Sequence, residues 1–216
     1  GIWHAGSPMG GILNLTRGMA VCVPRNMTQA AGLYNALLQS DEPGLVVERL
    51  NAYRSKEQLP SNLNEHTVPV GEPEVLQQGE HVTIVTYGAC VGVAEETMPK
   101  LEEAGISAEL IDVQTLLPFD RHQTIVQSLK KTNRVVFMDE DVPGGASAFM
   151  MEQALEKQGG YWQLDSEPTT VTAHPHRPPY ATDGDYFAKP HAEDLFDAVY
   201  GLMHEFDPVA YPGFYE

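Results

Sequence analysis

Residues 81 to 120, HVTIVTYGACVGVAEETMPKLEEAGISAELIDVQTLLPFD, decide the fold because they predict a strand, a helix and a second strand in succession. The run 81–87 is rich in β-branched residues and ends at Gly88, a residue typical of tight turns. Apolar residues then recur at helical spacing, namely Ala94, Met98 and Leu101. Gly105 is placed to end this helix before the apolar run 108–113. Since a helical crossover joins neighbouring parallel strands, the stretch predicts a βαβ unit.

The rest of the chain continues this alternation. Further strands are expected at 19–25, 45–50, 134–138 and 169–173, and further helices at 28–39, 121–133, 146–159 and 191–204. Asp120 is expected to be the N-cap of one of these helices, with Gln123 at the capping-box position. Residues 1–15 are expected to form a loop, because small residues dominate there. The pattern predicts an α/β fold with a doubly wound, mostly parallel sheet.

A change of pattern in the middle of the chain suggests two folding units. Residues 51–72 carry Asn, Ser, Pro and Glu with no sustained period, which predicts a linker. The unit before it, 1–50, holds one strand-helix-strand pattern and is expected to be incomplete. The chain begins with Gly1 and no initiator Met, so we expect truncation at this end. The unit after the linker is 73–216.

Composition narrows the function classes. The formal net charge is -17, with 13 Lys and Arg against 30 Asp and Glu, which argues against nucleic acid as a partner. No apolar run is long enough for a membrane span, so we expect a soluble protein without membrane contact. The only cysteines, Cys22 and Cys90, cannot form a disulfide framework, which fits a reducing compartment such as the cytoplasm.

One constellation suggests a nucleophile. Gly88-Ala89-Cys90-Val91-Gly92 lies between a strand and a helix, as in a nucleophile elbow with Cys in place of Ser. A thiol hydrolase would need a histidine base, for which His174 and His191 are the candidates. Buried free cysteines are common, and the pattern favours a Cys90 that packs in the first helical turn.

Two further groups could carry chemistry. Asp139, Glu140 and Asp141 follow a strand and precede Gly144-Gly145, where open sheets bind ligands. Three acids would repel a phosphate, so a solvated strand end or a subunit contact is favoured. His4 lies on a small-residue loop, where a histidine can move protons near neutral pH. The isolated loop favours the simpler interpretation, a surface histidine.

Six segments taken in order resemble one enzyme family. They are GIWHAGSP, VCVPRNMTQAAGLYNALLQSDEPGLVVE, VTIVTYG, ELIDVQTLLPFD, NRVVFMDEDVPGGASA and AHPHRPPY. Together they cover nearly the whole chain, and the set resembles the beta chain of thiamine-diphosphate-dependent 2-oxo acid dehydrogenases. The likeness is greatest to the branched-chain, 2-oxoisovalerate type, including fused alpha/beta polypeptides. The IDVQTLLPFD block is also typical of transketolase relatives.

The resemblance implies oxidative decarboxylation of a 2-oxo acid and transfer of the acyl group to a lipoyl group. It implies that 1–50 is the last part of a thiamine pyrimidine-binding domain and that 73–216 is a transketolase-like C-terminal domain. Thiamine diphosphate and magnesium would then be bound mainly by parts absent from this chain, so the chain alone should be inactive. Its own role would be subunit assembly and docking.

The resemblance also assigns residues. His4 matches the histidine of an H-S-x-S-P motif that serves in proton transfer during reductive acylation of the lipoyl group, and Met9 stands where an acid commonly follows the proline. A monovalent cation, potassium in this reading, would be held by main-chain oxygens at Leu37, Ser40 and Glu42, with Ser40 in place of a usual Asp. His176 stands at the Asp position of a G-x-D-x-P pattern.

The implied partners are an alpha chain or alpha half, a second beta copy and the lipoyl acyltransferase core, whose basic binding region would suit the acidic surface. A homo-oligomer is expected, in the cytoplasm or, in a eukaryote, the mitochondrial matrix. Two alternatives stay open, namely the Cys90 hydrolase and a non-catalytic interaction domain. The sequence leaves the identity of the 2-oxo acid undetermined.

Overall fold

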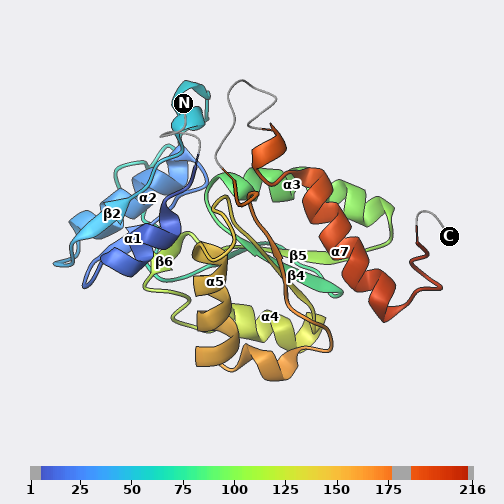
Figure 1. Cartoon of the computed structure of the whole chain (residues 1–216). Helices are drawn as coiled ribbons and strands as arrows, with labels where there is room; N and C mark the ends of the chain where they lie inside the picture. Colours follow the sequence, from blue (N-terminus) through green and yellow to red (C-terminus); the bar gives the residue numbers. More distant parts are fainter. Residues whose placement is uncertain (1–5, 177–185, 214–216) are drawn as a thin grey trace.

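The structure, a computed structural model, describes residues 6–176 and 186–213. The larger sheet in this part of the chain has five strands in the order β3-β5-β4-β7-β8 (Figure 1). Their bounds are Glu74–Gln77 for β3, Val82–Thr86 for β4, Ala108–Asp112 for β5, Val135–Met138 for β7 and Thr169–Val171 for β8. All neighbours are parallel except β3, which is antiparallel to β5. Because β5 and β7 flank β4 on opposite sides, the sheet is doubly wound, as predicted.

Helices cover both faces of this sheet (Figure 1). One face carries α3 (Ala89–Glu103) and α7 (Ala192–Phe206), and the other carries α4 (Thr124–Thr132) and α5 (Ala146–Met151), which continues as the π-helical segment η2 (Glu152–Lys157). Successive side chains of β4 alternate between the faces, since Ile84 packs among residues of α3 and α7 while Val85 packs among residues of α4 and α5. The central strand is therefore buried on both sides.

A second, three-stranded sheet belongs to the N-terminal part. Its order is β2-β1-β6, with β1 at Ala20–Cys22, β2 at Gly44–Val46 and β6 at Thr115–Leu117. Strand β1 is parallel to β2 and antiparallel to β6. Helices α1 (Met9–Leu15) and α2 (Met27–Leu38) lie with it at one side of the molecule (Figure 1). A strand of the C-terminal unit thus completes the sheet of the N-terminal one.

The two units share one apolar core. Met9 and Val21 from the first unit belong to the same buried cluster as Val85, Leu116 and Phe137 from the second. Phe137 and Val21 are fully buried, and Met9 is only 2% exposed. Burying such side chains is the main stabilising contribution to folding, so separating the units would expose much of this core to water.

Each predicted helix and strand has a counterpart in the structure, although the strands predicted at 19–25 and 45–50 are shorter, at Ala20–Cys22 and Gly44–Val46. The expected loop at 1–15 is wrong from residue 9 onward, because α1 forms there despite two glycines and buries Met9 in the shared core. Strands β3 and β6, and the short 3-10 helices η1 (Leu50–Arg54) and η3 (Gly160–Gln163), were not predicted. Such three- to five-residue elements carry too little periodic pattern to be recognised.

The predicted capping box at α4 is also wrong. The N-cap is Gln123, in the left-handed region at φ 56°, and its side chain makes no capping hydrogen bond. The Asp120 carboxylate instead accepts hydrogen bonds from the main-chain N–H groups of Thr124 and Ile125, both at 2.8 Å. Asp120 therefore satisfies the free N–H groups of the first turn from outside the helix.

The predicted linker, 51–72, is tied to α2. The Asn35 side chain donates to the main-chain oxygens of Leu63 and His66 at 2.9 and 2.7 Å, and Val68 N–H donates to Gly32 O at 3.1 Å. Apart from the rest of η1, no helix or strand occurs within 51–72. The division of the chain at 50 and 72 stays a prediction.

A group of charged side chains bridges the units at the edge of the core. Arg25, which follows β1, places Nη1 2.8 Å from both Glu74 Oε2 on β3 and Asp112 Oδ2 on β5. Gln29 on α2 adds a hydrogen bond to Glu74 at 2.8 Å. Burial raises the pKa of Asp112 to about 6 from 3.8, although Arg25 and the Gln114 N–H act in the opposite direction. Removing this carboxylate from water thus outweighs its pairing.

This balance predicts a pH-dependent stability. A carboxyl pKa that is higher in the folded chain contributes stability below pH 3.8, which is lost as the pH rises through about 6. Relative to Asp112→Asn, the wild-type chain should lose about 3 kcal/mol of unfolding free energy between pH 3.5 and 7.5. Urea unfolding of both proteins across that range measures the difference, and a pH-independent difference contradicts the assignment.

Candidate functional site

Cys90 lies in the first turn of α3 and is buried. The whole residue is only 3% exposed. Burial raises the pKa of its thiol well above the usual range, and the nearby carboxylates of Glu140 and Asp139 raise it further. Since the thiolate is the nucleophilic form, Cys90 is held in the unreactive state.

The two glycines that flank Cys90 do not both serve a tight strand-to-helix turn, as they would in a nucleophile elbow. Gly88 has φ +58°, and a Cβ there would lie 2.9 Å from Val23 Cγ1 of the first unit. A Cβ on Gly92, inside α3, would meet nothing within 4 Å. Only Gly88 is required by the backbone, and it permits contact between the two units.

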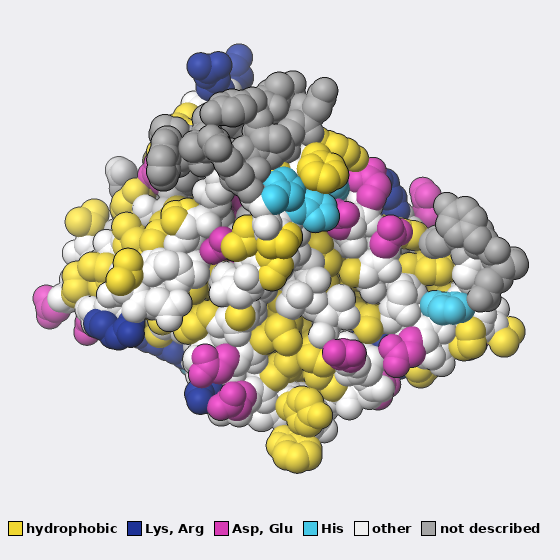
Figure 2. Space-filling view, in the orientation of Figure 1, with side chains coloured by type: hydrophobic (Ala, Val, Ile, Leu, Met, Phe, Trp, Pro, Cys, Tyr) yellow, Lys and Arg dark blue, Asp and Glu magenta, His cyan; other side chains and the backbone are white. Residues whose placement is uncertain are grey.

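The two histidines proposed as bases are engaged elsewhere. The His174 ring stacks on those of His176 and Phe187, at centroid distances of 5.7 and 5.2 Å. In Figure 2, histidine side chains lie beside apolar ones at the surface. His191 is the N-cap of α7, with Nδ1 2.6 Å from Asp194 Oδ2. The geometry therefore gives no support to the hydrolase alternative.

The acidic run after β7 is built into the fold. Asp139 is fully buried, and its Oδ1 accepts hydrogen bonds from Tyr87 OH at 2.5 Å and from Asp141 N–H at 3.0 Å. Its Oδ2 accepts from Ser147 N–H, at the start of α5, at 2.8 Å. Burial raises the pKa values of both Asp139 and Tyr87. The predicted solvated strand end is wrong for Asp139 and Asp141, which order the loop and are not exposed.

Glu140 pairs with a cation that sequence spacing did not reveal. Lys189 Nζ lies 2.6 Å from Glu140 Oε1, with both side chains partly exposed. The two residues are 49 positions apart, so no local pattern connects them. This pair ties the acidic run to the segment that leads into α7.

His4 lies outside the described residues. The motif that follows it is described from Gly6 onward, where Met9 N–H lies 3.4 Å from Ser7 Oγ and Pro8 is the N-cap of α1. Gly10 N–H, in the first turn of α1, donates to Asp141 Oδ2 at 2.9 Å. The helix that begins directly after this motif is thus bound to the acidic loop.

The three residues proposed to hold a cation lie together at the end of α2. Ser40 Oγ donates to Leu37 O at 3.0 Å and lies 3.5 Å from Glu42 O. The main-chain oxygens of Leu37 and Glu42, two of the three proposed ligands, therefore both lie near the Ser40 hydroxyl. The same residues line an open, largely apolar groove of about 790 Å³ between α1, α2 and β6.

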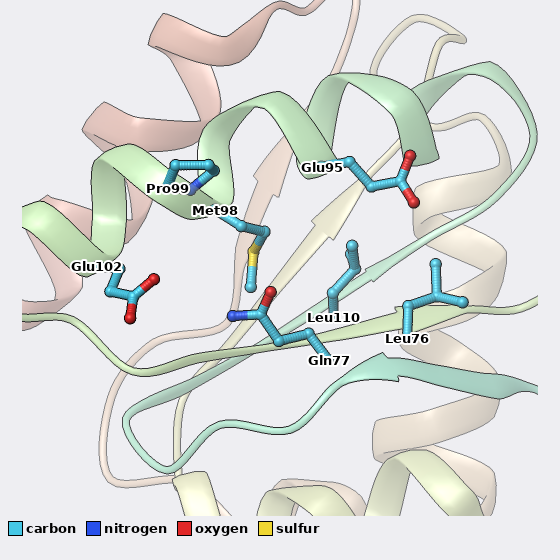
Figure 3. A pocket seen from close by; sticks show the side chains of 7 residues that line it. All are labelled: Leu76, Gln77, Glu95, Met98, Pro99, Glu102 and Leu110. Atoms are coloured by element: carbon cyan, nitrogen blue, oxygen red, sulfur yellow. The ribbon is translucent and has the colours of Figure 1, made fainter.

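A smaller hollow lies between α3 and the edge of the large sheet (Figure 3). Its volume is about 180 Å³, and Met98 points from α3 toward Gln77 and Leu110. Glu95 and Glu102 are the charged residues among those that line it. Apart from these two residues and Gln77, the residues that line the hollow are apolar, and nothing in it favours a particular reaction.

Within residues 6–176 and 186–213, no group of three or more His, Cys, Asp or Glu side chains could hold a metal ion. In the same part of the chain, no helix has the length and apolar character needed to cross a bilayer.

A family model described as "Transketolase, C-terminal domain" matches residues 71–193, more than half of the chain. The chain belongs to this family. The matched part of this transketolase C-terminal domain contains the large sheet, α3, α4 and α5. A solved structure, a "Split gene transketolase, inactive beta4 tetramer", agrees in fold with a TM-score of 0.74 at 22% identity, covering 93% of this chain and 64% of that one.

Curated relatives of this transketolase C-terminal domain chain are beta subunits. The 2-oxoisovalerate dehydrogenase subunit beta of Bacillus subtilis is 32% identical over 60% of this chain and 39% of its own length. The mitochondrial pyruvate dehydrogenase E1 component subunit beta of Pisum sativum is 30% identical over 89% and 54%. The acetoin:2,6-dichlorophenolindophenol oxidoreductase subunit beta of Bacillus subtilis is 33% identical over 78% and 48%. The chain thus spans about half the length of these relatives or less.

Both cysteines should be unreactive in the folded chain. Cys22 is fully buried, and burial raises its pKa to about 11; Cys90 is buried beside two carboxylates. We expect less than about 1% of the modification rate of the unfolded chain with an aromatic disulfide reagent, and no hydrolysis of a nitrophenyl ester. Rapid reaction of one thiol in the native chain, with loss of an esterase activity, would instead support the hydrolase.

Proposed function

We propose that this chain is the C-terminal part of the beta chain, or beta half, of a thiamine-diphosphate-dependent 2-oxo acid dehydrogenase. The observation that carries the proposal is the order of its motifs, from HAGSP at residues 4–8 to AHPHRPPY at 173–180, around a domain whose family is known. Two of the relatives named above are beta subunits of 2-oxo acid dehydrogenases, and the third is the beta subunit of an acetoin oxidoreductase, which supports the same assignment.

The substrate proposed is a branched-chain 2-oxo acid. The relatives name 2-oxoisovalerate, pyruvate and acetoin at nearly equal identity, so their names do not select among these substrates. The branched-chain type rests on the motif resemblance alone. A direct comparison of 2-oxoisovalerate with pyruvate as substrates of the complete polypeptide tests it.

Cofactor binding is assigned to other parts of the enzyme. Thiamine diphosphate supplies the carbanion stabilisation that decarboxylation of a 2-oxo acid requires. We assign the diphosphate and magnesium mainly to the alpha part and to upstream sequence, as the motif resemblance implies. This chain contributes the segment that carries His4, residues 1–8 and here named the His4 segment. It also positions that segment and makes contacts with partner chains.

His4 is proposed to move a proton during reductive acylation of the lipoyl group. A histidine titrates near neutral pH and can both donate and accept a proton. The segment that carries it leads directly into α1, whose Met9 is buried in the shared core. A fixed helix start is a suitable support for such a group.

The partners proposed are an alpha chain or half, a second beta copy and a lipoyl acyltransferase core. On the face shown in Figure 2, acidic side chains are scattered and basic ones lie mainly at the margins, which suits a basic partner. Leu15 and Leu38 are 85% and 83% exposed on α1 and α2, and they favour an apolar contact with another chain. The compartment proposed is the cytoplasm, or the mitochondrial matrix in a eukaryote.

A potassium ion is proposed at the end of α2. Its ligands would be the main-chain oxygens of Leu37, Ser40 and Glu42, two of which converge on Ser40 Oγ. Hard cations prefer such oxygen ligands. Further ligands would come from upstream sequence.

The role of His4 can be tested by separating two half-reactions. In the complete polypeptide with its alpha part, thiamine diphosphate and magnesium, His4→Ala should leave 2-oxoisovalerate decarboxylation with an artificial electron acceptor within about threefold of wild type. Acyl transfer to a free lipoyl domain should fall by about 100-fold or more. His122→Ala, which removes an exposed histidine beside Glu72, is the matched control. If His4→Ala and wild type transfer acyl groups equally, the assignment is wrong.

The cation site predicts ion-specific stability. At equal ionic strength, 100 mM potassium should raise the melting temperature of the complete polypeptide by about 2–4 °C relative to tetramethylammonium. Ser40→Ala should keep this effect, because the ligands are main-chain oxygens and the change frees Leu37 O from the hydroxyl. Equal melting temperatures in the two salts would count against the site.

A further inference from the structure

The carboxylate of Asp141 lies at the contact between the acidic loop and α1. Its Oδ2 accepts a hydrogen bond from Gly10 N–H at 2.9 Å, across a sequence separation of 131 residues. Gly10 is in the first turn of α1, where main-chain N–H groups have no partner within the helix. Pro8, the N-cap residue, provides no capping side chain. Asp141 therefore supplies the cap of α1 from another part of the chain, with a charge that suits a helix N-terminus.

Asp141 is itself held in place by buried groups. Its main-chain N–H donates to Asp139 Oδ1 at 3.0 Å, and the same oxygen accepts the Tyr87 hydroxyl. The other oxygen of Asp141 accepts Val142 N–H at 2.8 Å. Asp141 is 8% exposed, and Asp139 is fully buried. The acceptor that meets α1 is thus fixed relative to the large sheet.

The surrounding backbone approaches too closely for any side chain. A Cβ on Gly10 would lie 2.9 Å from Gly145 Cα and 3.2 Å from Asp141 Oδ2. A Cβ on Gly145 would lie 2.5 Å from Asp141 Cβ. By contrast, a Cβ on Gly11 would meet nothing within 4 Å. The start of α1 is therefore fitted against the acidic loop by hydrogen bonding and by shape.

We propose that Asp141 is a positioning residue for the His4 segment, in which His4 precedes Gly10 by six residues. The C-terminal unit would act on the reaction through this contact, by fixing where the segment enters α1. This inference rests on the proposed function of His4. The carboxylate does not touch substrate or cofactor in it, and its effect passes through the main chain of α1.

Variants of Asp141 test the proposal by rescue. Asp141→Ala removes the acceptor and should lower kcat for acyl transfer to the lipoyl domain by about 10- to 100-fold, since small displacements of a reacting group have effects of this size. Decarboxylation with an artificial acceptor should stay within about threefold of wild type. Asp141→Asn should transfer acyl groups within about threefold of wild type, because its amide oxygen can still accept Gly10 N–H, and only the hydrogen bond from Val142 N–H is lost to the amide nitrogen.

Gly10 and Gly11 of α1 provide a matched pair of variants on the other side of this contact. Gly10→Ala places a methyl group against Gly145 and should reproduce the loss in acyl transfer, whereas Gly11→Ala should behave as wild type. If Asp141→Ala fails to fold, Gly10→Ala still tests the contact. Equal acyl transfer in Asp141→Ala and wild type, or an equal fall in both half-reactions, overturns the proposal.

Hydrogen exchange separates this inference from the proposed function. In the complete polypeptide, the Gly10 amide should exchange at least about tenfold faster in Asp141→Ala than in wild type or Asp141→Asn, since a hydrogen bond to a charged group is lost. Absence of decarboxylation in wild type would refute the proposed function without affecting this readout. Unchanged exchange in Asp141→Ala would refute the inference whatever the activity.

Discussion

The arrangement of the chain depends on one apolar cluster to which both units contribute side chains. Met9 and Val21 meet Val85, Leu116 and Phe137 in a space from which water is excluded. The hydrophobic effect has no direction, so polar contacts at the edge fix the orientation of the units. Arg25 does so on one side through Glu74 and Asp112, and Asp141 does so on the other through Gly10.

The acidic run illustrates how position changes the meaning of a charge. Asp139 is buried and accepts hydrogen bonds from a hydroxyl and two main-chain N–H groups, so its cost of burial is offset by directed contacts. Glu140 reaches the surface and pairs with Lys189. Asp141 accepts the Gly10 N–H of α1, so three adjacent acids have three different roles.

Sequence reasoning succeeded where periodicity is strong and local. The alternation of β4 and the stripe Ala94, Met98 and Leu101 of α3 are readable without a structure, and so is the end of α4 at Asn133, with its left-handed φ of 59°. It failed where a distant partner decides the outcome. Met9 forms a helix because its side chain reaches a core built from later residues, and Asp141 is ordered by Asp139 while it binds Gly10.

The candidate site was open to prediction only through the resemblance. In the turn at Leu37, Ser40 and Glu42, two of the three proposed carbonyl ligands lie near the Ser40 hydroxyl, yet the spacing of these residues alone carries no signal for a cation. The link between α1 and the acidic loop joins residues with no shared motif, so a single sequence could not reveal it. Long-range hydrogen bonds leave little trace in local composition.

The pairing of β6 with β1 has a consequence for biosynthesis. Val21 finds its partner Leu117 only after the intervening chain, including β3, β4, α3 and β5, has been made. During translation the small sheet would leave the ribosome with one edge of β1 unpaired, and such an edge is prone to association with other chains. The same contact has a high sequence separation, which slows folding. A polypeptide that begins at residue 71 would in turn retain β6 without the strand against which it is built.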